Sequence, residues 1–188
     1  MAQRPSGHAR VLNDFYPEPI DCTEALIAAF DRVAGGFHDP FVGSGSTIVA
    51  AARHDITATG ADLVDRCGGR FPVRDFFTDR ACYPNFVTNP PFVRAAEAIE
   101  YGLDHLRDGG RIAILADLNF LSAQRRYALH TRPEFELLLV LMKRPSCPPG
   151  LQFLAGTIKR GNGSTNYGWF VYQCGRPAGP PRLVFAPP

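Results

Sequence analysis

The chain has 188 residues, enough for one domain with a substantial core and too few for two ordinary domains. Apolar residues make up 45% and charged residues 20%, a balance typical of soluble globular proteins. No apolar run approaches the ~20 residues of a membrane span, and the N-terminus lacks the apolar core of a signal peptide. We therefore expect a cytoplasmic protein that does not cross a membrane.

Cysteine and histidine usage argues against a disulfide framework and against a metal site. The five cysteines include no CxxC pair, and the five histidines show no ligand spacing. The net charge of +2 is too small to prove a nucleic-acid partner, so any basic patch has to be local.

The first third of the chain predicts a helix, a strand and a second helix. Polar residues 1–12 predict a loose arm. Residues 19–34 carry apolar side chains at helical spacing, and the glycines at 35–36 end that helix. A short strand over 37–41 leads into a glycine turn, which an apolar helix over 47–54 follows.

The middle of the chain predicts three more strands, over 57–63, 70–77 and 84–92. An amphipathic helix over 93–106 precedes a buried strand over 109–121.

The last third predicts two strands separated by irregular segments. Residues 122–131 predict a short basic helix or lid, and 135–144 predict a long apolar strand. A Pro/Gly-rich connection over 145–166 leads to a last strand over 167–174, and residues 176–188 predict a proline-rich tail.

Strands that alternate with helices indicate an α/β fold with a mostly parallel, doubly wound sheet. Since no clear helix separates the last two strands, we expect them to form a hairpin that makes one edge of the sheet antiparallel.

The glycine turn "DPFVGSGS" spans Asp39 to Ser46, and its glycines allow close approach of a ligand to the backbone. Ile48 stands where a dinucleotide fingerprint has a small residue, which argues against NAD, and no Gly-Lys-Ser/Thr P-loop is present. Asp39 suits a cationic ligand end such as an amino group or a sulfonium. The alternative is a tight structural turn.

Two acids end the next predicted strands. Asp62 is placed to accept from the ribose hydroxyls of an adenosine, and Asp75 from an adenine amine, because open sheets bind ligands at the carboxyl ends of their strands. The alternative is that both are solvated strand-end carboxylates.

The tetrad Asn89-Pro90-Pro91-Phe92 ends another predicted strand. The side-chain oxygen of Asn89 and the carbonyl of Pro90 offer two fixed acceptors, which suit a substrate –NH2 group. Phe92 offers a flat face for a planar group. The alternative is a strand terminator beside a core phenylalanine.

These motifs resemble those of class I S-adenosylmethionine (SAM)-dependent amino-methyltransferases. "DPFVGSGS" resembles their first SAM motif and "TNPPF" their catalytic Asn/Asp-Pro-Pro-aromatic motif. "NDFYPEP" is similar to a Tyr-Pro-Thr-Pro segment of N6-adenine-specific DNA methyltransferases, including small phage and prophage enzymes, and "YGWFVY" resembles their last strand. The resemblance runs from about residue 14 to 174.

The resemblance implies a Rossmann-like class I methyltransferase fold, with residues 1–188 as a single catalytic domain and SAM as cofactor. It implies that Tyr16 and Pro17 line the methionine end of SAM. It assigns the amino acid portion to Asp39, Phe41, Gly43 and Gly45, the ribose to Asp62, the adenine to Asp75, and the target amine to Asn89, Pro90, Pro91 and Phe92. Glu18 departs from the family's threonine.

The resemblance implies methyl transfer to the N6 amine of adenine in DNA. RNA bases and a protein glutamine are alternative substrates, and a catalytically silent nucleic-acid-binding subunit is an alternative function. The chain has no room for a separate recognition domain, so a homodimer or a recognition partner stays open. A base in duplex DNA has to be flipped out of the stack.

Four basic residues are candidates for nucleic-acid contacts: Arg125, Arg126, Lys159 and Arg160. Ordinary solvated surface charge is the alternative for each.

Overall fold

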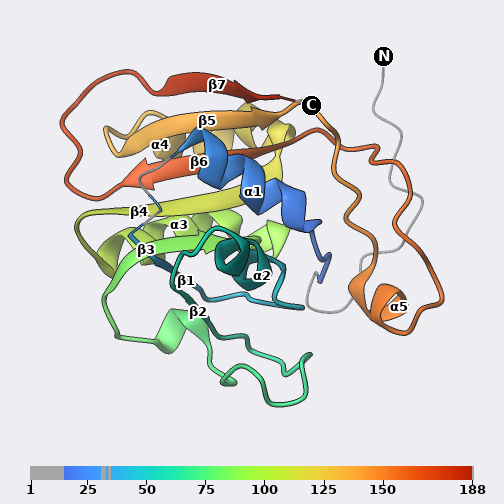
Figure 1. Cartoon of the computed structure of the whole chain (residues 1–188). Coiled ribbons are helices and arrows are strands. Elements are labelled where there is room, and N and C mark those ends of the chain that lie inside the picture. The colour runs from blue at the N-terminus through green and yellow to red at the C-terminus, as the bar shows by residue number, and fades with distance from the viewer. Residues whose placement is uncertain (1–14, 31–32, 34, 188) are drawn as a thin grey trace.

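The computed structural model of the chain describes residues 15–30, 33 and 35–187, so the predicted loose arm over 1–12 lies outside the described residues. The fold is a seven-stranded sheet in the order β2-β1-β3-β4-β6-β5-β7, with helices packed against both faces (Figure 1). The predicted α/β class is confirmed.

Four strands form the parallel half of the sheet. They are β1 (Phe37–Asp39), β2 (Ala58–Gly60), β3 (Tyr83–Thr88) and β4 (Leu106–Asp117). They are joined through α2 (Ser46–Arg53) and α3 (Ala95–Asp104), as strand-helix alternation predicts. The carboxyl ends of these strands therefore meet at one edge of the sheet.

The other half of the sheet contains the predicted hairpin. β5 (Phe135–Leu141) pairs antiparallel with β6 (Tyr167–Gln173), which also pairs antiparallel with β4. Because β5 therefore runs in the direction of β4, the 142–166 connection leaves β5 at the same edge as the parallel strands' carboxyl ends.

The predicted position of the hairpin and the predicted tail both need correction. Residues 182–186 of the tail form β7 (Arg182–Ala186), which pairs parallel with β5 and makes the actual sheet edge. Val184 and Ala186 pack against the core, so burial of one face outweighs the surrounding prolines.

The strand predicted over 70–77 is also wrong. Its only sheet contact in the described chain is an isolated bridge between Asp62 and Val73. Asp75 then caps the short 3-10 helix η3 (Phe76–Thr78) by accepting from the Phe77 N–H. A local side-chain cap thus replaces ladder pairing.

Two apolar clusters fill the space between the sheet and its helices. On one face, α1 (Ile20–Ala29) packs near α2 over a cluster that includes the fully buried Leu26 and Trp169, whose indole donates to the Cys22 carbonyl. On the other face, α3 covers a cluster centred on Phe86 and Phe170. This packing fixes β1 and β3 side by side, which brings the glycine turn next to the Asn-Pro-Pro-Phe tetrad.

The remaining elements are short. They are η4 (Phe92–Arg94), η5 (Leu118–Ser122), η6 (Gln124–Arg126), α4 (Tyr127–His130) and α5 (Gly150–Leu154). Within the described ranges no helix is long and apolar enough to cross a membrane.

Candidate functional site

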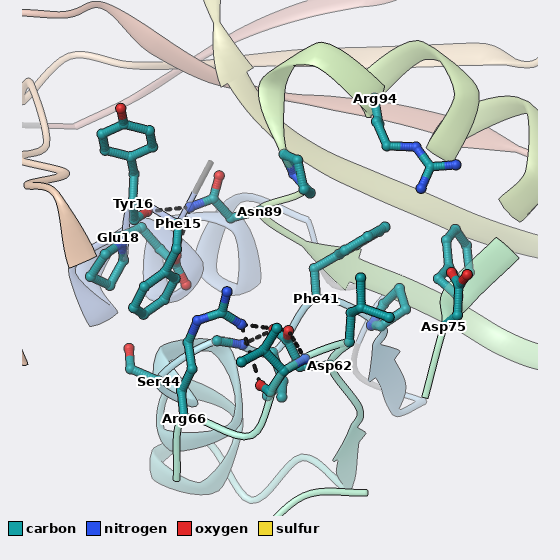
Figure 2. A pocket seen from close by; sticks show the side chains of 18 of the residues that line it. Phe15, Tyr16, Glu18, Phe41, Ser44, Asp62, Arg66, Asp75, Asn89 and Arg94 are labelled. Atoms are coloured by element: carbon teal, nitrogen blue, oxygen red, sulfur yellow. Dashed lines mark hydrogen bonds and ion pairs between the residues drawn. The ribbon is translucent and has the colours of Figure 1, made fainter. Parts of the chain in front are cut away.

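A cavity of about 680 Å³ opens at the carboxyl edge of the parallel strands (Figure 2). Its volume lies in the range typical of small-molecule and cofactor pockets. Eight of the residues that the sequence assigned to a site line it: Tyr16, Pro17, Phe41, Gly43, Asp62, Asp75, Asn89 and Pro91.

The glycine turn contacts Phe15 closely. Gly43 has a φ of 52°, and a Cβ there would lie 2.8 Å from the Phe15 ring, so no other residue fits without displacing that ring. The Gly43 N–H donates to Asp62 Oδ2 at 2.9 Å. The turn therefore joins the N-terminal segment to the end of β2.

Asp39 lies behind the cavity rather than in its wall. Its carboxylate is fully buried and accepts from the Phe41 N–H and from the hydroxyls of Thr47 and Thr88. Burial outweighs these donors and raises the pKa of Asp39 to about 7. In this structure Asp39 holds the glycine turn in place, whereas the sequence predicted a direct ligand contact.

Asp62 occupies the predicted place, but its oxygens are engaged. Besides Gly43, it accepts from the Val64 N–H and from Arg66, whose side chain is only 8% exposed. The Arg66 guanidinium lies 4.3 Å from the centre of the Phe15 ring, and its Nε is buried without a partner in the described chain. Sequence reasoning missed Arg66, because it lies in an irregular segment where its spacing from Asp62 gives no ion-pair signal.

Asp75 lies at the far end of the cavity, beside Arg94 (Figure 2). One of its oxygens accepts from the Phe77 N–H at 3.0 Å, and the other has no donor among the described residues. Phe41 and Phe76 form the apolar wall here, with ring centroids 5.3 Å apart in an edge-to-face arrangement. This end combines an apolar aromatic wall with a carboxylate acceptor.

Asn89 lies at the opposite end, beside Tyr16 and Glu18 (Figure 2). Its Nδ2 donates to the Tyr16 carbonyl at 2.9 Å and to Glu18 Oε2 at 2.8 Å. The carbonyl of Pro90 accepts no hydrogen bond from any described residue, while that of Pro91 accepts from the Arg94 N–H.

Phe92 differs from its predicted place. It does not line the cavity but stacks on Tyr16, with ring centroids 5.7 Å apart and an interplanar angle of 20°. Tyr16 thus occupies a face that the sequence assigned to a planar substrate group.

Glu18 is a site residue that sequence reasoning did not assign. It lines the cavity, is 6% exposed, and burial raises the pKa of its carboxyl. The departure from threonine in "YPEP" was the only signal for it.

The four basic candidates do not line the cavity. Arg160 donates to three backbone carbonyls, those of Pro17, Glu18 and Ser146, so its expected role as a free cation is not what the structure shows. Arg126 likewise donates to the carbonyls at 119 and 120. Arg125 and Lys159 are exposed.

No group of three or more His, Cys, Asp or Glu residues in the described ranges is arranged to hold a metal ion. The polar side chains that line the cavity include the carboxylates of Glu18, Asp62 and Asp75 and the amide of Asn89.

The fold that positions this cavity is that of the Rossmann-like class I methyltransferases. No family model matches the sequence, and no curated protein matches it either. The resemblance to solved structures is clear despite low sequence identity.

Three of these structures cover most of the chain. A Listeria monocytogenes protein assigned to the class I SAM-dependent methyltransferases has a TM-score of 0.60 and 12% identity, covering 95% of this chain and 67% of its own. A Pyrococcus horikoshii protein assigned as an RNA methyltransferase has a TM-score of 0.60 and 12% identity, and the match covers 89% of this chain and 90% of that protein. The M protein of the EcoKI type I restriction enzyme has 0.57 and 13%, covering 86% of this chain but only 44% of its own.

Proposed function

We propose that the protein is a SAM-dependent methyltransferase that methylates the N6 amine of adenine in DNA. The observation that carries this proposal is the orientation of Asn89, whose amide hydrogens bind Tyr16 and Glu18, beside a Pro90 carbonyl that accepts no bond from the described residues. Two oxygen acceptors, one on Asn89 in the cavity wall and one on the residue that follows it, suit the two hydrogens of a primary amine.

The cavity fits SAM in size and chemistry. Phe41, Phe76 and the unengaged oxygen of Asp75 suit an adenine ring with its amine. Gly43 brings backbone close to the ligand, and Asp62 stands where an adenosine ribose is expected once Arg66 releases it. When bound, SAM supplies an activated methyl group on a sulfonium.

The chain's own groups act on the target amine. Asn89 Oδ1 and the Pro90 carbonyl accept its two N–H bonds, which draws the nitrogen lone pair out of conjugation with the ring. The same oxygens stabilise the positive charge that the nitrogen develops, and they do so most strongly in the transition state. Solvent takes the proton that the methylated nitrogen then loses.

DNA is favoured as substrate by the resemblance of the tetrad and the "NDFYPEP" segment to adenine-specific DNA enzymes, and by the EcoKI M protein among the neighbours. An RNA base is the second candidate, because the Pyrococcus horikoshii protein matches this chain over nearly its whole length.

The test is incubation with methyl-labelled SAM and separate pools of DNA, RNA and protein, followed by mass analysis of the modified unit. We expect N6-methyladenine in the DNA pool. Label found only in RNA or only in glutamine would identify that molecule, and not DNA, as the substrate. Absence of transfer to any pool would refute the proposed methyltransferase activity.

Asn89→Ala gives a sharper test of the site. It removes one of the two acceptors, so we expect turnover to fall at least ~100-fold, as for loss of one preorganised hydrogen bond in a transition state. SAM affinity, measured by calorimetry, should change less than about threefold. Normal turnover in this variant would refute the role of Asn89.

A further inference from the structure

Glu18 is held in an unusual place for a carboxylate. It precedes α1 and is 6% exposed, and its Oε2 lies 2.8 Å from Asn89 Nδ2, although 71 positions separate the two residues. Burying a carboxylate costs free energy unless it is hydrogen-bonded, so the hydrogen bond from Asn89 offsets part of the cost of burying Glu18.

The partners of Asn89 fix which way its amide points. A backbone carbonyl has no hydrogen to donate, and Glu18 accepts at the oxygen that faces Asn89. Only the NH2 end of the amide can face these two groups, since the reversed amide would set oxygen against oxygen. Both amide hydrogens are consumed, and Oδ1 is left as an acceptor.

This arrangement restricts what the site can bind. With no hydrogen left to donate, Asn89 offers a substrate only an acceptor, and Pro90, which lacks an N–H, offers only its carbonyl. A group that brings two hydrogens satisfies both oxygens, whereas a carbonyl or ring nitrogen satisfies neither.

The backbone of Glu18 is held by a residue of the 142–166 connection. Arg160 donates to the carbonyls of Pro17 at 2.8 Å and Glu18 at 2.9 Å, and to Ser146 at 2.7 Å. These bonds tie the 142–166 connection to the segment that carries Glu18.

We propose that Glu18 is a positioning residue that binds the Asn89 amide and so makes Asn89 an obligate acceptor for an amine substrate. The inference rests on the proposed function for its substrate, but the orientation of Asn89 can be measured without turnover.

The kinetic test compares Glu18→Ala with Glu18→Gln. Alanine leaves one Asn89 hydrogen unpaired, and we expect kcat to fall about 10- to 100-fold, as for outer-shell partners of catalytic groups. SAM affinity should stay within about threefold. Glutamine can still present an oxygen to Asn89, so we expect it to keep clearly more activity than alanine. If glutamine is as inactive as alanine, Glu18 acts as a proton acceptor and the positioning role is wrong.

The second measurement is the side-chain amide resonance of Asn89 in ¹⁵N-labelled protein, identified by its loss in Asn89→Ala. We expect slow hydrogen exchange of this NH2 group in the wild type, faster exchange in Glu18→Ala, and a shifted resonance in both variants, because each variant changes the group that Asn89 Nδ2 faces. Unchanged exchange in Glu18→Ala, or an unshifted resonance in Glu18→Gln, would overturn the proposal. Because glutamine conserves the shape of the side chain, Glu18→Gln decides the question even if Glu18→Ala does not fold.

The matched control is Asp21→Asn, three residues further along. The Asp21 carboxylate is 46% exposed and pairs with Lys143, outside the cavity. It should change neither kcat nor the Asn89 resonance. A wild type that methylates no pool would reject the proposed function while the amide exchange still tests the orientation of Asn89.

Discussion

Arg66 is the residue whose position most affects the expected cofactor site. Its guanidinium binds Asp62 and stacks on Phe15, so it satisfies the carboxylate that would otherwise accept from a ribose. Its Nε nevertheless stays buried without a partner among the described residues, which costs free energy. Under the proposed function, Arg66 therefore competes with the ribose of SAM for Asp62.

We expect Arg66→Ala to tighten SAM binding by ~0.5–1.5 kcal/mol, because the ribose no longer has to displace the Arg66 guanidinium from Asp62. The SAM-free variant should melt at a lower temperature, since Asp62 loses a partner. Calorimetry and thermal unfolding measure both effects, with the exposed Arg70→Ala as control. Weaker SAM binding would mean that Arg66 contacts the cofactor instead.

Asp39 makes stability depend on pH. Its pKa is about 7 in the folded protein against 3.8 in the unfolded chain, so the folded protein keeps this proton at pH values where the unfolded chain has lost it. Its contribution is therefore fully present below pH ~4 and is lost as the pH rises to about 7.

The free energy of unfolding of the wild type minus that of Asp39→Asn should fall between pH 4 and 7, by up to about 1.4 kcal/mol per pH unit, and then level off. Urea denaturation across this range measures the difference. A difference that is constant or rises with pH would show that Asp39 is ionised throughout.

At the scale of elements, α5 supports the cavity from a distance. The Gly150 N–H donates to the Phe15 carbonyl at 2.8 Å, and the Phe15 ring fills the space between Gly150 and Gly43. The ring also supports Arg66, so a shift of α5 reaches the glycine turn and Asp62 through Phe15.

Gly150→Ala should therefore weaken SAM binding, although Gly150 lies outside the cavity wall. A Cβ there would clash with the Phe15 ring, which cannot retreat because Gly43 lies against its other side. We expect a stability loss of ~1–3 kcal/mol, typical of overpacking, together with a several-fold higher SAM dissociation constant. Gly161→Ala, in open space on the same connection, is the control. An unchanged SAM dissociation constant would show that α5 does not influence the cofactor site.

At the scale of the whole molecule, the two segments that carry Arg125 and Lys159 leave the sheet at the edge that carries the cavity. Arg125 follows the carboxyl end of β4, and Lys159 lies in the 142–166 connection after β5. Loops at this edge are where a bound nucleic acid would run if the proposed function is correct.

Arg125→Glu combined with Lys159→Glu should weaken DNA binding and reduce the slope of log affinity against log salt by about 1–2, because two phosphate contacts are lost. SAM affinity should be unchanged. The control variant replaces Arg80 and Arg107 with glutamate. Both are exposed near the amino ends of β3 and β4, and the control variant has the same net charge as the test variant. Equal weakening by both pairs would mean that the charge effect is not local.

The sequence by itself determined the order of most elements and indicated the edge of the sheet at which the cavity lies. Helical and strand periodicity, the glycine turn and the Asn-Pro-Pro run are local patterns, and each depends on neighbours along the chain. The rule that ligands bind at the carboxyl ends of parallel strands predicted that Asp62, Asp75 and Asn89 lie close together. All three line one cavity, although Asp75 follows no strand of the sheet.

Only the tertiary structure decided what those residues contact. Asp39 accepts hydrogen bonds from Thr47 and Thr88, and the Asn89 amide donates to Glu18. β7 joins the sheet although its sequence predicts a tail. These contacts join segments from different parts of the chain, and the packing of several elements fixes them together. Sequence spacing cannot specify them because a side chain's hydrogen-bond partners depend on which distant groups the fold buries beside it.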